Sequence, residues 1–271
     1  KGLKRLEYRG YDSSGIALLH EGELNLYKKQ GKVVNLEEYT SDKNRKGSIA
    51  IGHTRWATHG EPNDINAHPH ASSDGEIAMI HNGIIENYEP LKRELINKGY
   101  TFKSDTDTEV LTILVEDIKK NSNTSLAEAV RLALQQVVGA YAIVVISKNN
   151  PKQLVAARKS SPLVVGIGKN GDFFCASDAT PIVEYTKKVV YLEDEEIAVL
   201  DLDKGLKLYS IDDVAKTPYI QELELQLEAL EKGGYDHFML KEIHEQPRSI
   251  TDCFRGRLNA QKAWVSLGGI K

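Results

Sequence analysis

Short strand-like segments follow one another through the second half of the chain, and this pattern limits the fold more than any other feature. Apolar runs rich in β-favouring residues cover 140–147, 154–159, 163–168, 172–177, 189–192, 196–201 and 206–211. The turn residues 169–171 and 203–205 separate consecutive runs, as is typical of antiparallel hairpins. Helices are expected at 178–186 and, after the last strand, at 221–232. The second half therefore predicts antiparallel sheet.

The first half alternates between strands and helices. Strands are expected at 15–20, 23–30, 48–56 and 77–85, the first pair joined by a tight turn at Glu21-Gly22. The polar segment 59–75 is too long for a simple connection. Loops of that length inside a compact domain are usually functional.

Helix start signals follow these strands. The segment 87–98 has a proline in its first turn and a glycine after its end. Thr106 with Glu109 forms a capping box ahead of an apolar run, and the segment 125–139 begins with the same kind of box. Helices between strands, followed by antiparallel strands, predict an α+β fold with two sheets covered by helices.

The composition excludes several classes of protein. The 271 residues include 35 Lys and Arg against 39 Asp and Glu, so no overall basic field would attract nucleic acid. No apolar run reaches the ~18 residues of a membrane-spanning helix, and the first residues lead into no signal-peptide core. The two cysteines, Cys175 and Cys253, suit a reducing compartment. We expect a cytoplasmic protein that binds neither nucleic acid nor a membrane.

Histidines are concentrated in one part of the chain, which raises the question of a metal. Five of the eight histidines fall between residues 53 and 81, and His68-Pro69-His70 is the closest pair. No cysteine lies near this pair and no His-Glu-x-x-His motif occurs. We expect no metal and no organic cofactor, and we keep a metallo-hydrolase using His68 and His70 as an alternative.

Three polar segments are hard to explain by structure alone. Arg55–Gly60 stands where a strand meets the long loop, His81-Asn82-Gly83 interrupts an apolar run, and Ser104–Glu109 crowds acids and hydroxyls at a helix start. Helix capping or a structural ion pair would account for single residues. Together, a cation, an anion and an amide donor beside a glycine suit a free amino acid, with its carboxylate, its ammonium and a developing oxyanion.

Several of these segments resemble one known family. The quoted runs are Arg5-Leu-Glu-Tyr-Arg9-Gly-Tyr-Asp-Ser13, Gly52-His-Thr-Arg-Trp-Ala-Thr-His-Gly60, His81-Asn-Gly-Ile-Ile-Glu-Asn87, Thr106–Glu109, Ser161–Leu163, Ala176–Asp178 and Lys241–Pro247. In order and approximate spacing they resemble the glutaminase domain of the glutamine–fructose-6-phosphate aminotransferases, which are class-II glutamine amidotransferases. The resemblance extends over essentially the whole chain.

The resemblance implies a fold and a set of site residues. The fold is that of the N-terminal-nucleophile hydrolases, an αββα sandwich of two antiparallel sheets between helical layers. By resemblance, Arg55, Thr58 and His59 bind the α-carboxylate of L-glutamine, and Asp107 with the Gly83 backbone holds the α-ammonium. Asn82 and the Gly83 N–H form the oxyanion hole. Trp56 lies on a loop that closes over glutamine and gates ammonia, and Arg9 supports the surroundings of the nucleophile.

One part of the family pattern is missing from these 271 residues. The family's nucleophile is a cysteine at the start of the mature chain, whose own α-amino group acts as the base. The amine has a pKa of ~7.7–8.0 and a thiol ~8.5, so proton transfer between them is nearly matched. Neither Cys175 nor Cys253 corresponds to that cysteine. We therefore expect the intact parent to be a transferase and this chain to be inactive, with a glutamine-binding module that lacks a nucleophile as the other alternative.

The resemblance also implies an organisation and partners. We expect residues 1–240 to be a glutaminase domain that lacks its first strand and nucleophile. Residues 241–271 are expected to be a linker toward a sugar-phosphate isomerase domain outside the chain. Fructose 6-phosphate would bind only through that further domain. The parent protein is expected to form a homodimer.

Overall fold

The computed structural model describes residues 1–223, 234–254, 258–259 and 264–265. The chain divides into two compact units, Lys1–Glu224 and Leu225–Lys271. The second unit contains helix α7 (Phe238–Phe254) and a short strand pair, β15 (Leu258–Asn259) with β16 (Trp264–Val265). Among these described residues, no helix has the length and apolar character needed to cross a membrane. The proposed functional boundary at residue 240 stays a prediction.

A seven-stranded antiparallel sheet forms one layer of the first unit. Its strands, in spatial order, are β13 (Ala215–Lys216), β12 (Gly205–Ser210), β11 (Glu196–Asp201), β7 (Gln153–Lys159), β6 (Gly139–Ser147), β5 (Ile77–Ile85) and β4 (His70–Ala71). Strand β5 pairs with β6 along its whole length, from Ile77 opposite Ser147 to Ile85 opposite Gly139. This complete ladder fixes where each side chain of β5 lies.

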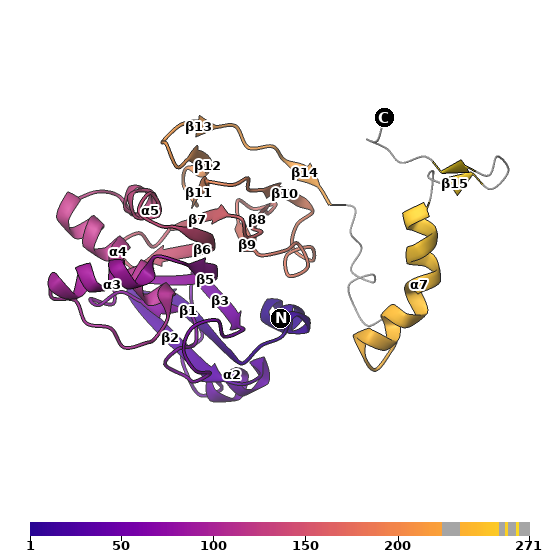
Figure 1. Ribbon diagram of the computed structural model, residues 1–271, viewed down its shortest axis with the longest axis horizontal. Coiled ribbons are helices and arrows are strands. Elements are labelled where there is room, and N and C mark those ends of the chain that lie inside the picture. The colour runs from indigo at the N-terminus through magenta and orange to yellow at the C-terminus, as the bar shows by residue number, and fades with distance from the viewer. Residues whose placement is uncertain (224–233, 255–257, 260–263, 266–271) are drawn as a thin grey trace. The chain divides into compact units, whose positions relative to one another are not determined.

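Helices cover one face of the seven-stranded sheet. They are α3 (Tyr88–Asn97), α4 (Asp107–Ser122) and α5 (Leu126–Leu134), seen together on one side in Figure 1. Leu111 of α4 and Ile143 of β6 are nearly inaccessible to solvent and belong to the apolar core between helices and sheet. Burying apolar surface in this way supplies most of the driving force for such a layer.

The second layer of strands is divided into two smaller sheets. One contains β2 (Glu23–Gln30), β1 (Ser13–His20) and β3 (Ile49–Arg55) in that order, and the other contains β14 (Gln221–Glu222), β10 (Lys188–Tyr191), β8 (Val164–Ile167) and β9 (Phe173–Ala176). Strands β3 and β9 are each the edge of their sheet. A second apolar core lies between the layers and includes Ile51 of β3 and Val144 of β6.

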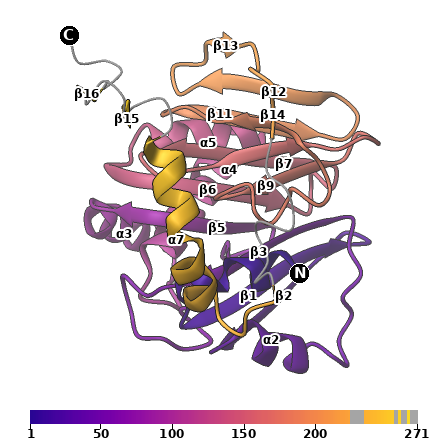
Figure 2. The same cartoon turned by 90° about the vertical axis from the view of Figure 1, so that its right-hand side faces the viewer.

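Short helices complete the second layer. Helix α2 (Val33–Tyr39) packs against β1 and β2 and lies on the outer side of the three-stranded sheet (Figure 2). Helix α1 (Gly2–Leu6), followed by the 3-10 turn η1 (Glu7–Arg9), packs against β3. Arg5 of α1 forms an ion pair with Glu184 at 2.9 Å. Helix α1 thus links the side of β3 to the segment that follows β9.

Most predicted elements are present, two predictions are wrong, and a third is contradicted only at its start. Residues 178–186 form turns rather than a helix, and their backbone bonds belong to separate turns, from the Val183 N–H to the Ala179 carbonyl and from the Tyr185 N–H to the Ile182 carbonyl. Helix α5 ends at Leu134 rather than at residue 139, where Gly139 has a positive φ and begins β6. The helix predicted over 221–232 starts instead as strand β14, and residues 224–232 lie outside the described residues.

Candidate functional site

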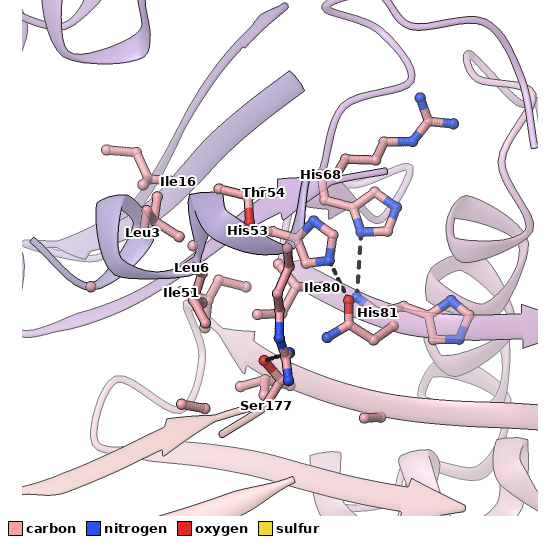
Figure 3. Close-up of a pocket in the computed structure, with 18 of the residues that line it drawn as sticks. Leu3, Leu6, Ile16, Ile51, His53, Thr54, His68, Ile80, His81 and Ser177 are labelled. Carbon is pink, nitrogen blue, oxygen red and sulfur yellow. Dashed lines mark hydrogen bonds between the residues drawn. The ribbon is translucent and has the colours of Figure 1, made fainter. Parts of the chain in front are cut away.

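One cavity of about 800 Å³ brings the predicted site residues together. Figure 3 shows part of its lining, including His53, His68 and His81. The cavity lies between the edge strands β3 and β9, and side chains of β6 also line it. Every residue that the sequence predicted for the site lines this cavity: Arg9, Arg55, Trp56, Thr58, His59, Asn82, Gly83 and Asp107. Segments far apart in the sequence therefore line one cavity, and the role of each residue stays a prediction.

Arg55 ends strand β3 with its guanidinium buried inside the polar loop. Its Nη2 donates to the carbonyls of His59 and Gly60, and its Nη1 donates to that of Glu61 at 3.5 Å. Burial lowers the Arg55 pKa from its usual value, while the Asp12 carboxylate nearby opposes that shift. These bonds do not use all N–H donors of a guanidinium. Arg55 thus organises the loop and still presents a cationic group beside the cavity.

The loop after Arg55 is held at its start by Asp12. The Asp12 N–H donates to the Arg55 carbonyl at 2.7 Å, and the Asp12 carboxylate accepts the Ala57 N–H. Trp56, which is 68% exposed, packs over Gly10. A Cβ at Gly10 would overlap the Trp56 ring, and the positive φ of Gly10 also favours glycine. Trp56 is therefore a large apolar side chain anchored at one edge and open to solvent.

Asn82 and Gly83 face the cavity from the middle of β5. Asn82 is exposed, and its Oδ1 lies 2.8 Å from Nε2 of His53 on β3. Gly83 has a φ of 127°, and a Cβ there would overlap the carbonyl oxygen of Ala140 on β6. Because only glycine accepts that conformation and that close approach, the backbone beside Asn82 is fixed by the β5–β6 ladder.

Asp107 begins helix α4 and is buried. Its Oδ2 accepts the N–H of Ile85 at 2.8 Å, which ties the helix to the end of β5. Thr106 caps the helix by accepting the Glu109 N–H, as predicted. The reciprocal bond of the capping box is different, because the Glu109 carboxylate accepts the N–H groups of Lys103 and Ser104. Asp107 lines the cavity, and its Oδ1 accepts only a long bond from the Thr108 hydroxyl at 3.4 Å, so it has acceptor capacity for a further donor.

A group of buried imidazoles lies behind Asn82. The rings of His53 and His68 have centroids 4.4 Å apart, and those of His68 and His70 are 4.9 Å apart. Burial lowers the pKa of His53 to about 4 and holds the pKa values of His68 and His70 well below the usual range. These side chains are therefore neutral at pH 7.

The alternative of a metal at His68 and His70 finds little support in this arrangement. Nε2 of His68 is 3.3 Å from the Thr108 hydroxyl, and Nε2 of His70 is 3.1 Å from the Thr106 hydroxyl. In the part of the chain that the structure describes, no group of three or more His, Cys, Asp and Glu residues is placed to hold a metal ion. The imidazole nitrogens instead form hydrogen bonds with the first turn of α4.

Cys175 of β9 also lines the cavity but has the wrong protonation state for a nucleophile. Burial raises the pKa of its thiol to about 12. A thiol rather than a thiolate therefore predominates at neutral pH, and the thiolate is the reactive form. Cys253, the other cysteine, is exposed on α7 in the second unit.

Arg9 approaches the cavity from the side of β9. Its Nη1 donates to the Ser177 hydroxyl at 2.8 Å, drawn in Figure 3, and its Nη2 lies 3.2 Å from the Asp178 carboxylate. Arg9 thus connects η1 with the end of the four-stranded sheet. This position at the margin of the cavity is compatible with a supporting role.

Sequence reasoning did not place His53 in the amino-acid site, and it considered His68 only as a metal ligand. Both are buried next to predicted site residues, and His53 contacts Asn82 directly. His53 does lie inside the Gly52–Gly60 run, and its alternation with Arg55 along the strand places both side chains on one face. This alternation could have placed His53 on the same face as Arg55, but it does not identify Asn82 of β5 as the partner of His53.

Comparison with known proteins places these features in a family context. A family model described as "Glutamine amidotransferase domain" matches residues 35–204. The glutamine–fructose-6-phosphate aminotransferase [isomerizing] of Bacteroides thetaiotaomicron is 58% identical over 271 residues, which is 100% of this chain and 44% of that protein. The enzyme of the same name from Chlorobaculum tepidum is 53% identical, over 99% of this chain and 44% of its own length. The chain therefore spans less than half the length of these relatives.

Solved structures show the same fold. A glutamine phosphoribosylpyrophosphate amidotransferase from B. subtilis, complexed with ADP and GMP, superposes with a TM-score of 0.66 at 27% identity, over 78% of this chain and 45% of that one. A structure titled as the allosteric regulatory enzyme of purine biosynthesis gives 0.65 at 29% identity, with the same shares covered. With the antiparallel sheets described above, these matches confirm the predicted N-terminal-nucleophile hydrolase fold.

Proposed function

The chain belongs to the glutamine amidotransferase family, and from that premise we propose that it is the glutamine-hydrolysing part of a glutamine–fructose-6-phosphate aminotransferase. The identity to enzymes of that name supports the specific assignment. The observation that carries the proposal is the convergence of a buried cation, a buried carboxylate and an exposed amide on one cavity. These are complementary to the α-carboxylate, the α-ammonium and the side-chain amide of L-glutamine.

The two ends of the amino acid would be held by opposite charges. Arg55, with Thr58 and His59 next to it on the loop, would bind the α-carboxylate. Asp107 would bind the α-ammonium through Oδ1, since Oδ2 already accepts the Ile85 N–H. The Gly83 backbone would contribute to the ammonium site. Charge-assisted hydrogen bonds of this kind are about twice as strong as neutral ones, so they fix the orientation of the substrate.

The scissile amide would then face Asn82. Attack by a thiolate on the amide carbon makes a tetrahedral oxyanion, which the Asn82 amide and the Gly83 N–H would stabilise. The leaving nitrogen takes a proton and departs as ammonia, and water hydrolyses the thioester to glutamate. Removing one donor from an oxyanion hole typically costs ~2.7–4 kcal/mol of transition-state stabilisation.

The nucleophile would come from a segment outside residues 1–271. The cavity lies between β3 and β9, each of which is the edge strand of its sheet. An added strand there would join the three-stranded and four-stranded sheets and carry the nucleophilic cysteine of the family to Asn82. Pairing such exposed edges also removes an aggregation hazard. The 271 residues alone would then bind glutamine without cleaving it, since the Cys175 thiol stays protonated.

The remaining assignments extend beyond this chain. Trp56 would close over glutamine and gate the passage of ammonia, and Arg9 would support the nucleophile strand. Fructose 6-phosphate would bind a further domain, and the whole protein would be a cytoplasmic homodimer. Neither an organic cofactor nor a metal takes part in the proposed glutaminase chemistry.

Steady-state glutaminase kinetics test the assigned roles. The protein would be the chain extended upstream to its first cysteine, with glutamate release as the signal. Arg55→Lys removes the planar fork and is expected to raise KM for L-glutamine with a smaller effect on kcat. Asn82→Ala is expected to lower kcat by about 100–1000-fold with little change in KM. Lys204→Ala, in the turn between β11 and β12, is the control.

Two results would overturn the proposal. The first is an extended chain that releases no glutamate from L-glutamine while it folds normally. The second is an inverted pattern, in which Asn82→Ala changes only KM and Arg55→Lys changes only kcat.

A further inference from the structure

Among the described residues, His53 is the only group that forms a hydrogen bond with the Asn82 side chain. It lies on β3 with 8% of its surface exposed, and its Nε2 is 2.8 Å from Asn82 Oδ1. The bond joins β3 to β5, and a dashed line from the His53 ring marks it in Figure 3. A side chain of one layer thus contacts the proposed oxyanion donor of the other.

The hydrogen-bond pattern selects one tautomer of His53. Its pKa of about 4 leaves the ring neutral at pH 7, with a proton on one nitrogen only. Nδ1 is buried and has no hydrogen-bond partner. A proton on Nδ1 would leave a buried donor unpaired and would also turn the lone pair of Nε2 toward the Asn82 Oδ1 acceptor 2.8 Å away. The proton is therefore on Nε2, and it is donated to Asn82 Oδ1.

This tautomer also fixes the orientation of the Asn82 amide. With Oδ1 accepting from His53, the NH2 group of Asn82 is the end that remains for the cavity. If the amide turned over, its nitrogen and the protonated Nε2 of His53 would be two donors facing each other. The orientation of an asparagine amide is decided by such neighbours.

A second imidazole holds His53 in place. The His53 and His68 rings lie at 31° to one another with centroids 4.4 Å apart. The His81 N–H points at Nδ1 of His68 over 3.4 Å, so Nδ1 is the acceptor and Nε2 carries the proton toward the Thr108 hydroxyl, 3.3 Å away. A line of defined contacts therefore runs from the first turn of α4 through His68 and His53 to Asn82.

We propose that His53 is a positioning residue, which turns the Asn82 amide so that its NH2 group faces the reacting carbonyl. This inference rests on the proposed function, because the NH2 group matters only if an oxyanion develops there. Without the His53 donor, the Asn82 amide is free to present its carbonyl oxygen to the developing negative charge. That orientation both removes a donor and adds a repulsive dipole.

The tautomer can be measured without any catalysis. The 271-residue chain, with 15N-labelled histidine rings, would be studied by long-range 1H–15N correlation, and the His53 signals would be identified by their loss in His53→Gln. We expect His53 as the neutral Nε2–H form from pH 7 down to pH 5. A proton on Nδ1, or an imidazolium at pH 7, would overturn the inference whatever the enzyme does.

A matched pair of variants tests the effect on the reaction. In the chain extended to its first cysteine, His53→Gln keeps an N–H near the position of Nε2, whereas His53→Asn places its amide near Nδ1, too short to reach Asn82. We expect His53→Asn to lower kcat on the order of 100-fold with KM for L-glutamine little changed, and His53→Gln to retain most of kcat.

The outcomes separate the two proposals. Equal losses in the two variants, or a loss that appears only in KM, would mean that His53 has a packing role and would overturn the inference. If the extended chain lacks glutaminase activity altogether, the proposed function fails, and the tautomer measurement still decides whether His53 orients Asn82.

Discussion

One strand layer of this protein is a continuous sheet, and the other is divided into two sheets. The continuous layer carries the larger apolar core, whereas the cavity lies at the division of the other layer. The seven-stranded sheet is paired throughout and packs against α3–α5 over a large apolar core. The opposite layer is divided into sheets of three and four strands, and the cavity lies between their edges. The continuous layer holds Asn82 and Gly83, and helix α4, which packs on it, holds Asp107. The divided layer supplies Arg55, His53 and Arg9, and leaves room for a ligand.

The largest expected contrast is in the free energy of unfolding when the same substitution is made in each layer. Ile143→Ala on β6 leaves a cavity in a fully packed core and is expected to cost about 2–5 kcal/mol. Ile51→Ala on β3 enlarges an existing cavity beside an edge strand, so a smaller loss is expected. Urea unfolding of both variants measures the difference. Equal losses would mean that the divided layer is as well packed as the continuous one.

A smaller effect concerns pH and the imidazoles between the layers. His53 has a folded pKa of about 4 against 6.5 in the unfolded chain, so the unfolded state binds more protons between these values. The contribution of His53 to the free energy of unfolding therefore has its full value above pH 6.5, and it decreases as the pH falls toward 4.

His53→Gln removes this titration and provides the measurement. The free energy of unfolding of the unmodified chain should fall more steeply between pH 6.5 and 5 than that of His53→Gln, by on the order of 1 kcal/mol per pH unit. Parallel slopes in the two proteins would contradict a buried neutral His53.

The smallest expected effect compares two helix caps on the continuous layer. Thr106 caps α4 and also contacts the His70 ring at the site, whereas Ser125 caps α5 and is exposed. Thr106→Ala is expected to cost about 1–2 kcal/mol and Ser125→Ala about 0.5–1 kcal/mol of unfolding free energy. Thermal or urea unfolding would resolve the order. A reversed order would show that the contacts of Thr106 with the imidazoles contribute little.

Turn residues and apolar alternation in the sequence predicted the strands and hairpins whose formation depends on neighbouring residues. The hairpin of β1 and β2 turns at Glu21 and Gly22, which both have positive φ, as the turn signal indicated. Strands β5 and β11 have the predicted bounds, since alternation and flanking polar residues define them. Strand β4 was not predicted, because its two residues, His70 and Ala71, are held by pairing with β5 and not by their own propensity.

For the candidate site, the sequence likewise identified residues but not the contacts between them. The sequence segments with Arg55, Asn82 and Asp107 were chosen for their chemistry and their resemblance to a family, and they do converge on one cavity. Their distances and the partners of each group depend on how β3, β5 and α4 pack, which no local pattern contains. His53 illustrates this limit, because nothing in the sequence distinguishes it from an ordinary core histidine until it is seen beside Asn82.

The central claim is that these residues form a glutamine site whose nucleophile comes from outside residues 1–271. The most direct measurement is glutamate release from L-glutamine by this chain, compared with the chain extended upstream to its first cysteine. The account predicts turnover by the extended chain alone. Turnover by both at similar rates would contradict it, because the nucleophile would then lie within the 271 residues.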